Sequence, residues 1–314
     1  MMKNIRCFAL LSVLLMIVSC YPEQELDYSR WYPELDDEEL VPKEDIEGLM
    51  VMSSNVRFYS ARNKADDPDT GERDWEVRKE GYFQMLNTML PDVMGVQEAE
   101  FKQIQDIVEN CPEYAYVGVG RNDGAESGES TAIFYNKSVV DIEDWGTVWL
   151  SPTPGTAGSC FPEMTDKQSR TATWGVLKEK ETEKKFFYLN SHTSLYSASQ
   201  PKEIQVILAT VAEKCSAGLP LVLSADWNME ETDSMMQPVH DLYKSARQTA
   251  DLTDNSLTYH WWGDKNVISK NQHLDHIFYA GFTGCPRFRT LNMQWKGMWI
   301  SDHHPVYAIF QFEK

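Results

Sequence analysis

Carboxylate, amide and imidazole side chains follow the ends of several apolar runs in this sequence. The positions concerned are Asn55, Glu98, His192, Asp226 with Asn228, and Asp302 with His303, and Asp275 opens a further run. Taken alone, each is better explained as a turn residue or as a hydrogen-bonded structural residue. Carboxylates hold hard cations and imidazoles transfer protons, so the whole set indicates metal-assisted acid–base chemistry, provided that these run ends meet at one edge of the fold.

The spacing of these residues suggests separate roles. Asp226 and Asn228 are two positions apart, so on a strand both side chains point to one face and Trp227 points into the packing. Asp302 and His303 are neighbours and would point to opposite faces, so Asp302 is a poor partner for that imidazole. Because an imidazole that transfers protons needs a second group to fix its tautomer, we expect Asp275 to be the partner of His303.

Glu98 is the residue that we expect to hold a cation. Magnesium takes one or two protein carboxylates and keeps its other positions for water and phosphate oxygens. One glutamate, helped by Asn55 and Asp302, would therefore be a sufficient site for Mg²⁺, with Mn²⁺ or Ca²⁺ as alternatives.

These residues lie in six short motifs that follow one another along the chain. The motifs are N-V-R at 55–57, G-V-Q-E at 95–98, N-S-H at 190–192, A-D-W-N at 225–228, L-D-H-I at 274–277 and S-D-H-H-P-V at 301–306. In this order they resemble the motif set of the endonuclease/exonuclease/phosphatase superfamily, whose fold is deoxyribonuclease I-like, over about residues 49–314. Ala225 stands where this family commonly has glycine, and His276 where it often has an aromatic residue; neither change removes a functional group.

The resemblance implies a divalent-metal phosphoester hydrolase and a role for each residue. Glu98 would be the principal metal ligand, with Asn55 and Asp302 near the metal. His192 and Asn228 would hold phosphoryl oxygens, Asp226 would position the attacking water, and Asp275 with His303 would transfer a proton.

Two further features have both a structural and a functional interpretation. Arg170 opens a strand beside a long polar loop, and is either a phosphate contact or a structural arginine. The aromatic run 258–262 is more typical of a core than of a stacking platform, although it could line a pocket for a sugar or a base.

The apolar runs themselves predict a strand-rich domain with few helices. Strands are expected at 49–54, 92–96, 114–119, 131–135, 147–150, 171–177, 186–189, 219–224, 274–279 and 306–312, and helices at 75–90, 99–110 and 201–214. This alternation favours a mixed sheet or a sandwich flanked by helices. The resemblance implies the more specific α+β arrangement of two packed mixed β-sheets between helices, a four-layer α/β sandwich.

The first 48 residues are expected to lie outside that domain. Residues 1–19 have a basic start and a short apolar stretch, typical of a signal peptide and too short to span a bilayer. The end of this stretch resembles a bacterial lipobox, in which Cys20 would be acylated; an ordinary secretory signal is the alternative. Residues 20–48 are rich in Asp and Glu and predict a solvated tether. We therefore expect a lipoprotein of the cell envelope, held on the membrane by its acyl chains.

Charge and cysteine content limit the class of partner. With 29 Lys and Arg against 48 Asp and Glu, the net charge of −19 disfavours sequence-independent DNA binding. The substrate is expected to be phosphorylated, whether a small molecule, a lipid head group or nucleic acid, and the protein to be a monomer. A surface lipoprotein that binds glycan or lipid without catalysis is the alternative.

Four cysteines remain outside the first 48 residues. They could form two disulfides or remain free: Cys111, Cys160, Cys215 and Cys285.

Overall fold

The structure is a computed structural model that describes residues 46–59 and 69–313. The expected signal peptide, Cys20 and almost all of the acidic tether lie outside the described residues. Within the described part, no helix has both the length and the apolar character needed to cross a membrane.

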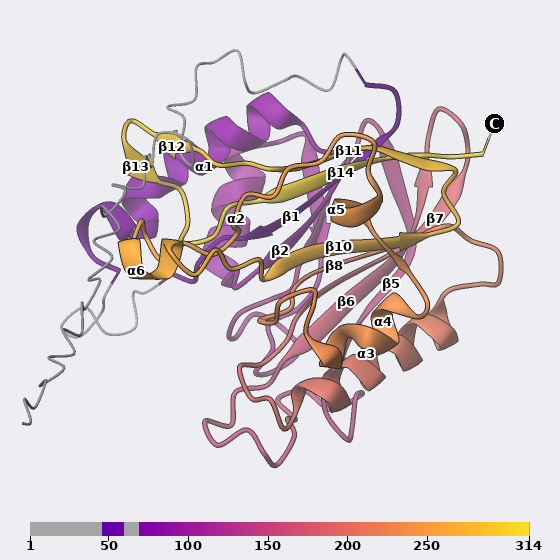
Figure 1. Cartoon of the computed structure of the whole chain (residues 1–314), viewed down its shortest axis with the longest axis horizontal. Helices are drawn as coiled ribbons and strands as arrows, with labels where there is room; N and C mark the ends of the chain where they lie inside the picture. Colours follow the sequence, from indigo (N-terminus) through magenta and orange to yellow (C-terminus); the bar gives the residue numbers. More distant parts are fainter. Residues whose placement is uncertain (1–45, 60–68, 314) are drawn as a thin grey trace, which may run out of the picture.

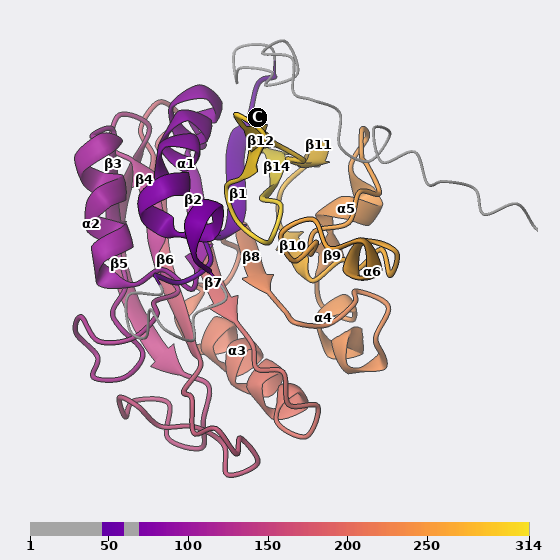
Figure 2. The same cartoon turned by 90° about the vertical axis from the view of Figure 1, so that its left-hand side faces the viewer.

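Two six-stranded sheets form the centre of the molecule (Figures 1 and 2). The first sheet runs in the order β11 (Gly284–Thr290), β14 (Val306–Gln311), β1 (Leu49–Asn55), β2 (Val93–Gln97), β4 (Ile133–Asn136) and β3 (Tyr114–Val117). The second runs in the order β5 (Val140–Trp149), β6 (Thr171–Glu179), β7 (Lys185–His192), β8 (Leu221–Asp226), β10 (Asp275–Ala280) and β9 (Lys244–Ser245). A small ribbon pairs β12 (Gln294–Trp295) with β13 (Met298–Trp299).

Helices cover the outer faces of both sheets. The helices α1 (Trp75–Met89) and α2 (Phe101–Asn110) lie against the first sheet, and α3 (Gln200–Lys214) lies against the second (Figure 2). Short helical segments complete the chain: η3 (Gly71–Arg73), η4 (Ser234–Met236), α4 (Gln237–His240), α5 (Ala246–Thr249) and α6 (Lys265–Ile268). The expected α+β sandwich of two mixed sheets between helices is therefore confirmed.

Alternation of apolar side chains explains why the two sheets stack. On β1, Leu49 and Val51 pack into the core between the sheets, whereas Met50 and Met52 pack towards α1. On β7, Phe186 and Tyr188 face the core between the sheets, and Phe187 and Leu189 face α3. Because successive strand residues point to opposite faces, a strand that is apolar at every position must be covered on both sides.

The strand directions bring polar side chains to one edge. The central pair of each sheet is parallel, β1 with β2 and β7 with β8, whereas β10 runs antiparallel to β8. The register places His192 opposite Asp226, and Asp275 opposite Asp226 on the other side. The carboxyl ends of four strands and the start of a fifth thus meet at this edge.

The expected strands and helices are present, with differences at the edges of the sheets. β5 begins at Val140 rather than at 147, and β11 was not expected at all. Val77, placed on the apolar stripe of the first helix, is instead 41% exposed. None of the four described cysteines is paired, so of the two alternatives the free thiols are observed.

Arg78 of α1 joins three segments that surround the polar edge. Its fully buried guanidinium donates hydrogen bonds to the backbone carbonyls of Val56 (2.6 Å), Arg57 (2.7 Å), Arg73 (2.9 Å) and Ile300 (2.8 Å). Burial lowers the pKa of Arg78 to about 10. The side chain therefore fixes the end of β1 and the loop that leads to β14 relative to α1.

Replacing Arg78 with Met is expected to destabilise the protein by about 3–5 kcal/mol, because it leaves buried carbonyls without donors. Urea unfolding followed by circular dichroism measures this loss. Lys79→Met on the same helix is the matched control and should change the free energy of unfolding by less than about 1 kcal/mol, since Lys79 pairs with the exposed Glu76 and lies 3.7 Å from Asp106, which keeps Trp75 and Lys102 as hydrogen-bond partners. Equal midpoints for the two variants would contradict the role assigned to Arg78.

Candidate active site

Asn55, at the end of β1, links the two sheets through its side-chain amide. Its Nδ2 donates to Glu98 Oε1 (2.9 Å) and to Asp226 Oδ2 (3.0 Å), and its Oδ1 accepts from the backbone N–H of Arg57 (2.9 Å). Since its oxygen is already bound, Asn55 orients the two carboxylates in this structure. Glu98 and Asp226, which lie 128 positions apart, are thereby held side by side.

Asp275 and His303 form a buried pair next to Asp226. The Nδ1 atom of His303 lies 2.8 Å from Asp275 Oδ2, and its Nε2 lies 3.8 Å from Asp226 Oδ2. Burial lowers the pKa of His303, but Asp275 and Asp226 raise it by more, to about 10. Asp275 is thus the carboxylate in contact with this imidazole. This agrees with the expectation that Asp302, the direct neighbour of His303 in sequence, would be a poor partner for it.

His192 is held at the end of β7 by two side chains. Asn228 Nδ2 lies 3.0 Å from its Nε2 and also donates to the carbonyl of Thr193 (2.9 Å). Arg170 Nη1 lies 3.0 Å from both ring nitrogens. Burial, followed by the positive charges of Arg170 and Arg121, lowers the pKa of His192 well below its ordinary value. His192 is therefore a neutral ring near pH 7, able to donate one hydrogen bond.

Glu98 and Asp302 face each other across the guanidinium of Arg57. Arg57 Nη1 lies 3.8 Å from Glu98 Oε2 and 3.8 Å from Asp302 Oδ2. Glu98 has a left-handed backbone (φ 62°) and also accepts from the N–H of Phe58 (3.2 Å). Burial raises the pKa of Glu98, but Arg57 and the hydrogen bond from Asn55 lower it by more, so Glu98 remains ionised.

The residues of the cluster fit a divalent cation. Four carboxyl groups and two basic groups meet here, so the carboxylates outnumber the basic groups, and Arg57 is in addition paired with Asp69. The acids are Glu98, Asp226, Asp275 and Asp302, and the bases are Arg57 and His303. Burial raises the pKa of Asp226 to about 7 and that of Asp302 above its ordinary value. A divalent cation would offset this excess of negative charge, and ligand atoms of Glu98, His192 and Asp226 lie within 4.8 Å of one another.

The aromatic run 258–262 divides between core and site. Tyr259 packs against His303 with ring centroids 4.9 Å apart, and Trp261 lies 4.9 Å from the guanidinium of Arg57. His260 and Trp262 are buried. The core interpretation is thus confirmed for His260 and Trp262, whereas Tyr259 and Trp261 contact residues of the polar cluster, and a pocket for a sugar or a base stays a prediction. Arg57 was not among the residues singled out from the sequence, although its place in N-V-R, two positions after Asn55, was a usable signal.

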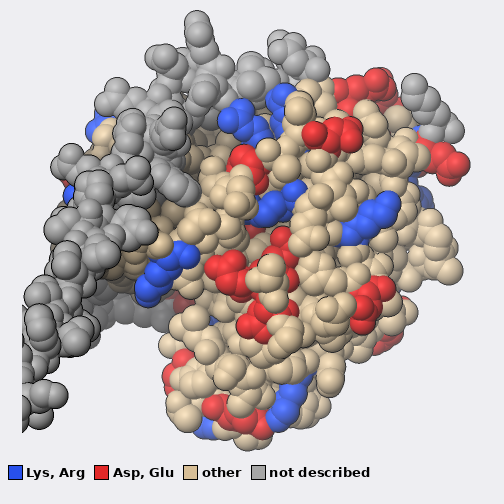
Figure 3. Space-filling model, in the orientation of Figure 1, with Lys and Arg blue, Asp and Glu red and all other residues tan. Residues whose placement is uncertain are grey.

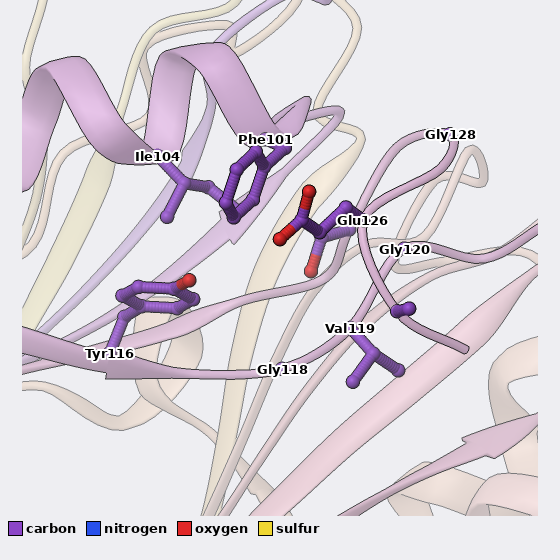
Figure 4. Close-up of a pocket in the computed structure, with 10 residues that line it drawn as sticks. Phe101, Ile104, Tyr116, Gly118, Val119, Gly120, Glu126 and Gly128 are labelled. Carbon is purple, nitrogen blue, oxygen red and sulfur yellow. The ribbon is translucent and has the colours of Figure 1, made fainter. Parts of the chain in front are cut away.

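Two small cavities lie on the side of Glu98 that faces the loop 118–130. One, of about 10 Å³, is lined by Glu98, His192 and Arg170 among others, and could hold about one water molecule. The other, of about 20 Å³, lies between Phe101, Tyr116 and the glycine-rich loop, with Glu126 near its mouth (Figure 4). This second cavity contains no residue of the polar cluster and is too small for a substrate.

Basic residues near the cluster are paired with acids. Arg121 makes a bidentate ion pair with Glu129, in which Nη1 and Nη2 each lie 2.7 Å from one carboxylate oxygen. Arg57 Nε lies 2.7 Å from Asp69 Oδ2. On the face shown in Figure 3, Lys and Arg are likewise interspersed with Asp and Glu. The described part of this face therefore shows no basic stripe of the kind with which proteins commonly bind duplex DNA.

Known structures share this fold. An endonuclease/exonuclease/phosphatase family protein of Bacteroides thetaiotaomicron is 26% identical with a TM-score of 0.76, covering 85% of this chain and 99% of that one. A mannosyl-6-phosphatase of the same organism is 26% identical with a TM-score of 0.74, covering 84% of this chain and 100% of that one. TDP2 of D. rerio, solved with a single-stranded DNA product, is 17% identical with a TM-score of 0.63, covering 85% of this chain and all of that one.

The family of these proteins acts on phosphorylated compounds, generally by hydrolysis and typically with a divalent metal. The sequence model of the Endonuclease/Exonuclease/phosphatase family matches residues 52–303, a span that holds every polar residue of the cluster. The chain belongs to the endonuclease/exonuclease/phosphatase family.

Proposed function

We propose that this protein is a divalent-metal-dependent phosphoester hydrolase in which water attacks phosphorus. The observation that carries the proposal is the buried cluster, in which carboxylates outnumber basic groups, in contact with the Asp275–His303 pair. A surface that only bound a ligand would gain nothing from burying so many uncompensated carboxylates.

Some residues of the cluster would bind the metal ion, and others would orient water and transfer a proton. Glu98 and Asp302 would hold Mg²⁺, which when bound would stabilise negative charge on the phosphoryl group. Asp226 and His303 are 3.8 Å apart, so one oxygen atom can contact both. Asp226 would orient the attacking water there and accept its proton as the water oxygen bonds to phosphorus, while His303, fixed by Asp275, would give its Nε2 proton to the oxygen that leaves phosphorus.

His192 is the neutral donor that would hold a phosphoryl oxygen, and Asn228 would orient it, because the two N–H groups of Asn228 Nδ2 are used on His192 Nε2 (3.0 Å) and on the carbonyl of Thr193 (2.9 Å). His192 and Asn228 lie in contact with each other and next to Asp226, which is 3.6 Å from His192. Arg170 is 8% exposed and reaches His192 directly. We therefore propose that Arg170 acts by holding the His192 ring and its neutral state.

A small phosphorylated molecule is the substrate class that the surface favours over duplex DNA. Arg121 is paired with Glu129, and Lys and Arg alternate with Asp and Glu on the face shown in Figure 3, so the described part of that face offers no continuous basic track for a polyanion. The fold shared with a mannosyl-6-phosphatase supports the same class.

Hydrolysis of para-nitrophenyl phosphate and bis-para-nitrophenyl phosphate with Mg²⁺, and its abolition by excess EDTA, tests the proposal. Turnover that returns when Mg²⁺ is restored is expected. A folded sample that hydrolyses neither ester, nor any member of a panel of sugar phosphates, inositol phosphates, sphingomyelin and plasmid DNA, would instead favour a non-catalytic lipoprotein that binds glycan or lipid.

We also propose that the enzyme works at the cell envelope, anchored through an acylated Cys20. Cys20→Ser is expected to move nearly all of the protein from the membrane fraction to the soluble fraction, since a single remaining hydrophobic signal gives only weak membrane binding. Fractionation and immunoblotting of cells that express each form measure this shift, with Cys111→Ser as the control that should stay in the membrane fraction. Membrane retention of the Cys20→Ser protein would argue against the anchor.

A further inference from the structure

Arg57 has a backbone conformation that residues other than glycine seldom adopt. Its φ is 55°, in the left-handed region. Three hydrogen bonds fix this conformation: its N–H donates to Asn55 Oδ1 (2.9 Å), and its carbonyl accepts from Arg78 Nη2 (2.7 Å) and Gln103 Nε2 (2.8 Å). Such strain persists only where the surroundings enforce it, and it is concentrated at functional sites.

The side chain of Arg57 is held on three sides and open on the fourth. Its Nε donates to Asp69 Oδ2 (2.7 Å), and the guanidinium carbon lies 4.3 Å from the ring centre of Phe58 and 4.9 Å from that of Trp261. The side chain remains 13% exposed. Among residues 46–59 and 69–313, neither Nη atom has a hydrogen-bond partner, so both terminal nitrogens can bind a ligand.

These terminal nitrogens face the proposed metal site. Nη1 lies 3.8 Å from both Glu98 Oε2 and Asp302 Oδ2, beyond hydrogen-bond distance from each. Burial lowers the pKa of Arg57, but the carboxylates of Asp302, Glu98 and Asp69 raise it by more, so the side chain stays charged. His192, the donor proposed for a phosphoryl oxygen, and Asn228, which orients it, are neutral groups.

We infer that Arg57 binds the additional anionic oxygen of a phosphomonoester and makes the site selective for terminal phosphate dianions over phosphodiesters. This inference rests on the proposed hydrolase function. A diester offers two non-bridging oxygens that share one negative charge, whereas a monoester offers three that share two at neutral pH. A fixed guanidinium, which donates two hydrogen bonds from a planar fork, matches that additional oxygen and charge.

The test compares the two para-nitrophenyl esters, which have the same leaving group. Relative to wild type, Arg57→Gln is expected to lower kcat/KM for the monoester by about 10²- to 10³-fold and for the diester by less than about 10-fold. The inhibition constant of inorganic phosphate should rise in parallel. Arg57→Lys keeps the positive charge but not the planar fork, so its kcat/KM for the monoester should lie between the values of wild type and Arg57→Gln. Arg287→Gln, on the edge strand β11, is the matched control and should leave both activities unchanged.

Asp69→Asn provides a variant that retains Arg57 but weakens its anchor. It is expected to lower the monoester-to-diester ratio by about 10-fold, because a mispositioned charge stabilises the transition state less. Thermal melting of each variant identifies loss of folding, which would reduce both activities together.

The outcomes separate this inference from the proposed function. If wild type hydrolyses neither ester, the hydrolase proposal itself fails. If wild type is active but prefers the diester, or if Arg57→Gln and Asp69→Asn leave the ratio of the two activities unchanged, Arg57 is not the selectivity residue and the inference is wrong.

Discussion

Replacing His303 with alanine is expected to lower kcat for phosphoester hydrolysis by about 10³- to 10⁴-fold, the upper range for loss of a positioned acid–base group. The imidazole lies between Asp275 (2.8 Å) and Asp226 (3.8 Å), so the variant loses the proton carrier and leaves two buried carboxylates in contact with an empty space. Initial rates with para-nitrophenyl phosphate at saturating Mg²⁺ measure the effect.

His273→Ala is the matched control for this prediction. His273 lies on a loop and faces Glu230 at 3.6 Å, apart from the cluster, so its removal should leave kcat within about twofold. A folded His303→Ala protein that keeps more than about a tenth of wild-type kcat would contradict the role of His303 in proton transfer.

Replacing Glu98 with glutamine is expected to lower kcat/KM by about 10³-fold at a Mg²⁺ concentration that saturates the wild type, through loss of the principal ligand charge. The substitution keeps the size of the side chain but removes one of the four carboxylates. Since Glu98 is among the groups that raise the pKa of Asp302, its neutral replacement should relieve repulsion in the metal-free protein.

The two effects can be separated by thermal melting. Metal-free Glu98→Gln protein should melt at or above the temperature of metal-free wild type, whereas Mg²⁺ should raise the melting temperature of wild type only. Glu126→Gln, on the loop near the second cavity, is the control for a general change of charge. A Glu98→Gln variant whose rate depends on Mg²⁺ as the wild type does would show that the cation binds elsewhere.

The polar edge of this fold was predictable because each strand end carries its own local pattern. An apolar run followed by Asp226 or His192 defines both the strand and the point at which it stops. Strand alternation at Asp302 and His303 also predicted Asp275 as the partner of the imidazole, and that partner is confirmed. The two residues nevertheless precede β14, which begins at Val306, so their separation comes from the bend before the strand and not from alternation along it.

Contacts made by long side chains across the fold could not be predicted in this way. Arg57 reaches its position through Asp69 and Trp261, and the second of these is about two hundred residues away. The amide of Asn55 bridges carboxylates of both sheets, whereas its spacing suggested only a place near the metal. Such arrangements depend on packing between distant segments, for which a single sequence gives no signal.

Edge strands were missed for a related reason. β5 and β11 each lie at the edge of a sheet, where one side has no neighbouring strand and charged residues replace the apolar pattern. The stretch Asp141–Asp144 and the residues around Pro286 therefore resemble loops in sequence, and each contains an irregularity at which the pairing with β6 or with β14, respectively, shifts register.

Anomalous diffraction from crystals soaked in Mn²⁺ tests the central claim most directly, because it locates the cation without reference to activity. One strong peak is expected within about 2.3 Å of a carboxylate oxygen of Glu98, and it should be absent from crystals of Glu98→Gln. Peaks confined to other acidic residues of the surface, with none at Glu98, would contradict the claim that these carboxylates gather around a divalent cation.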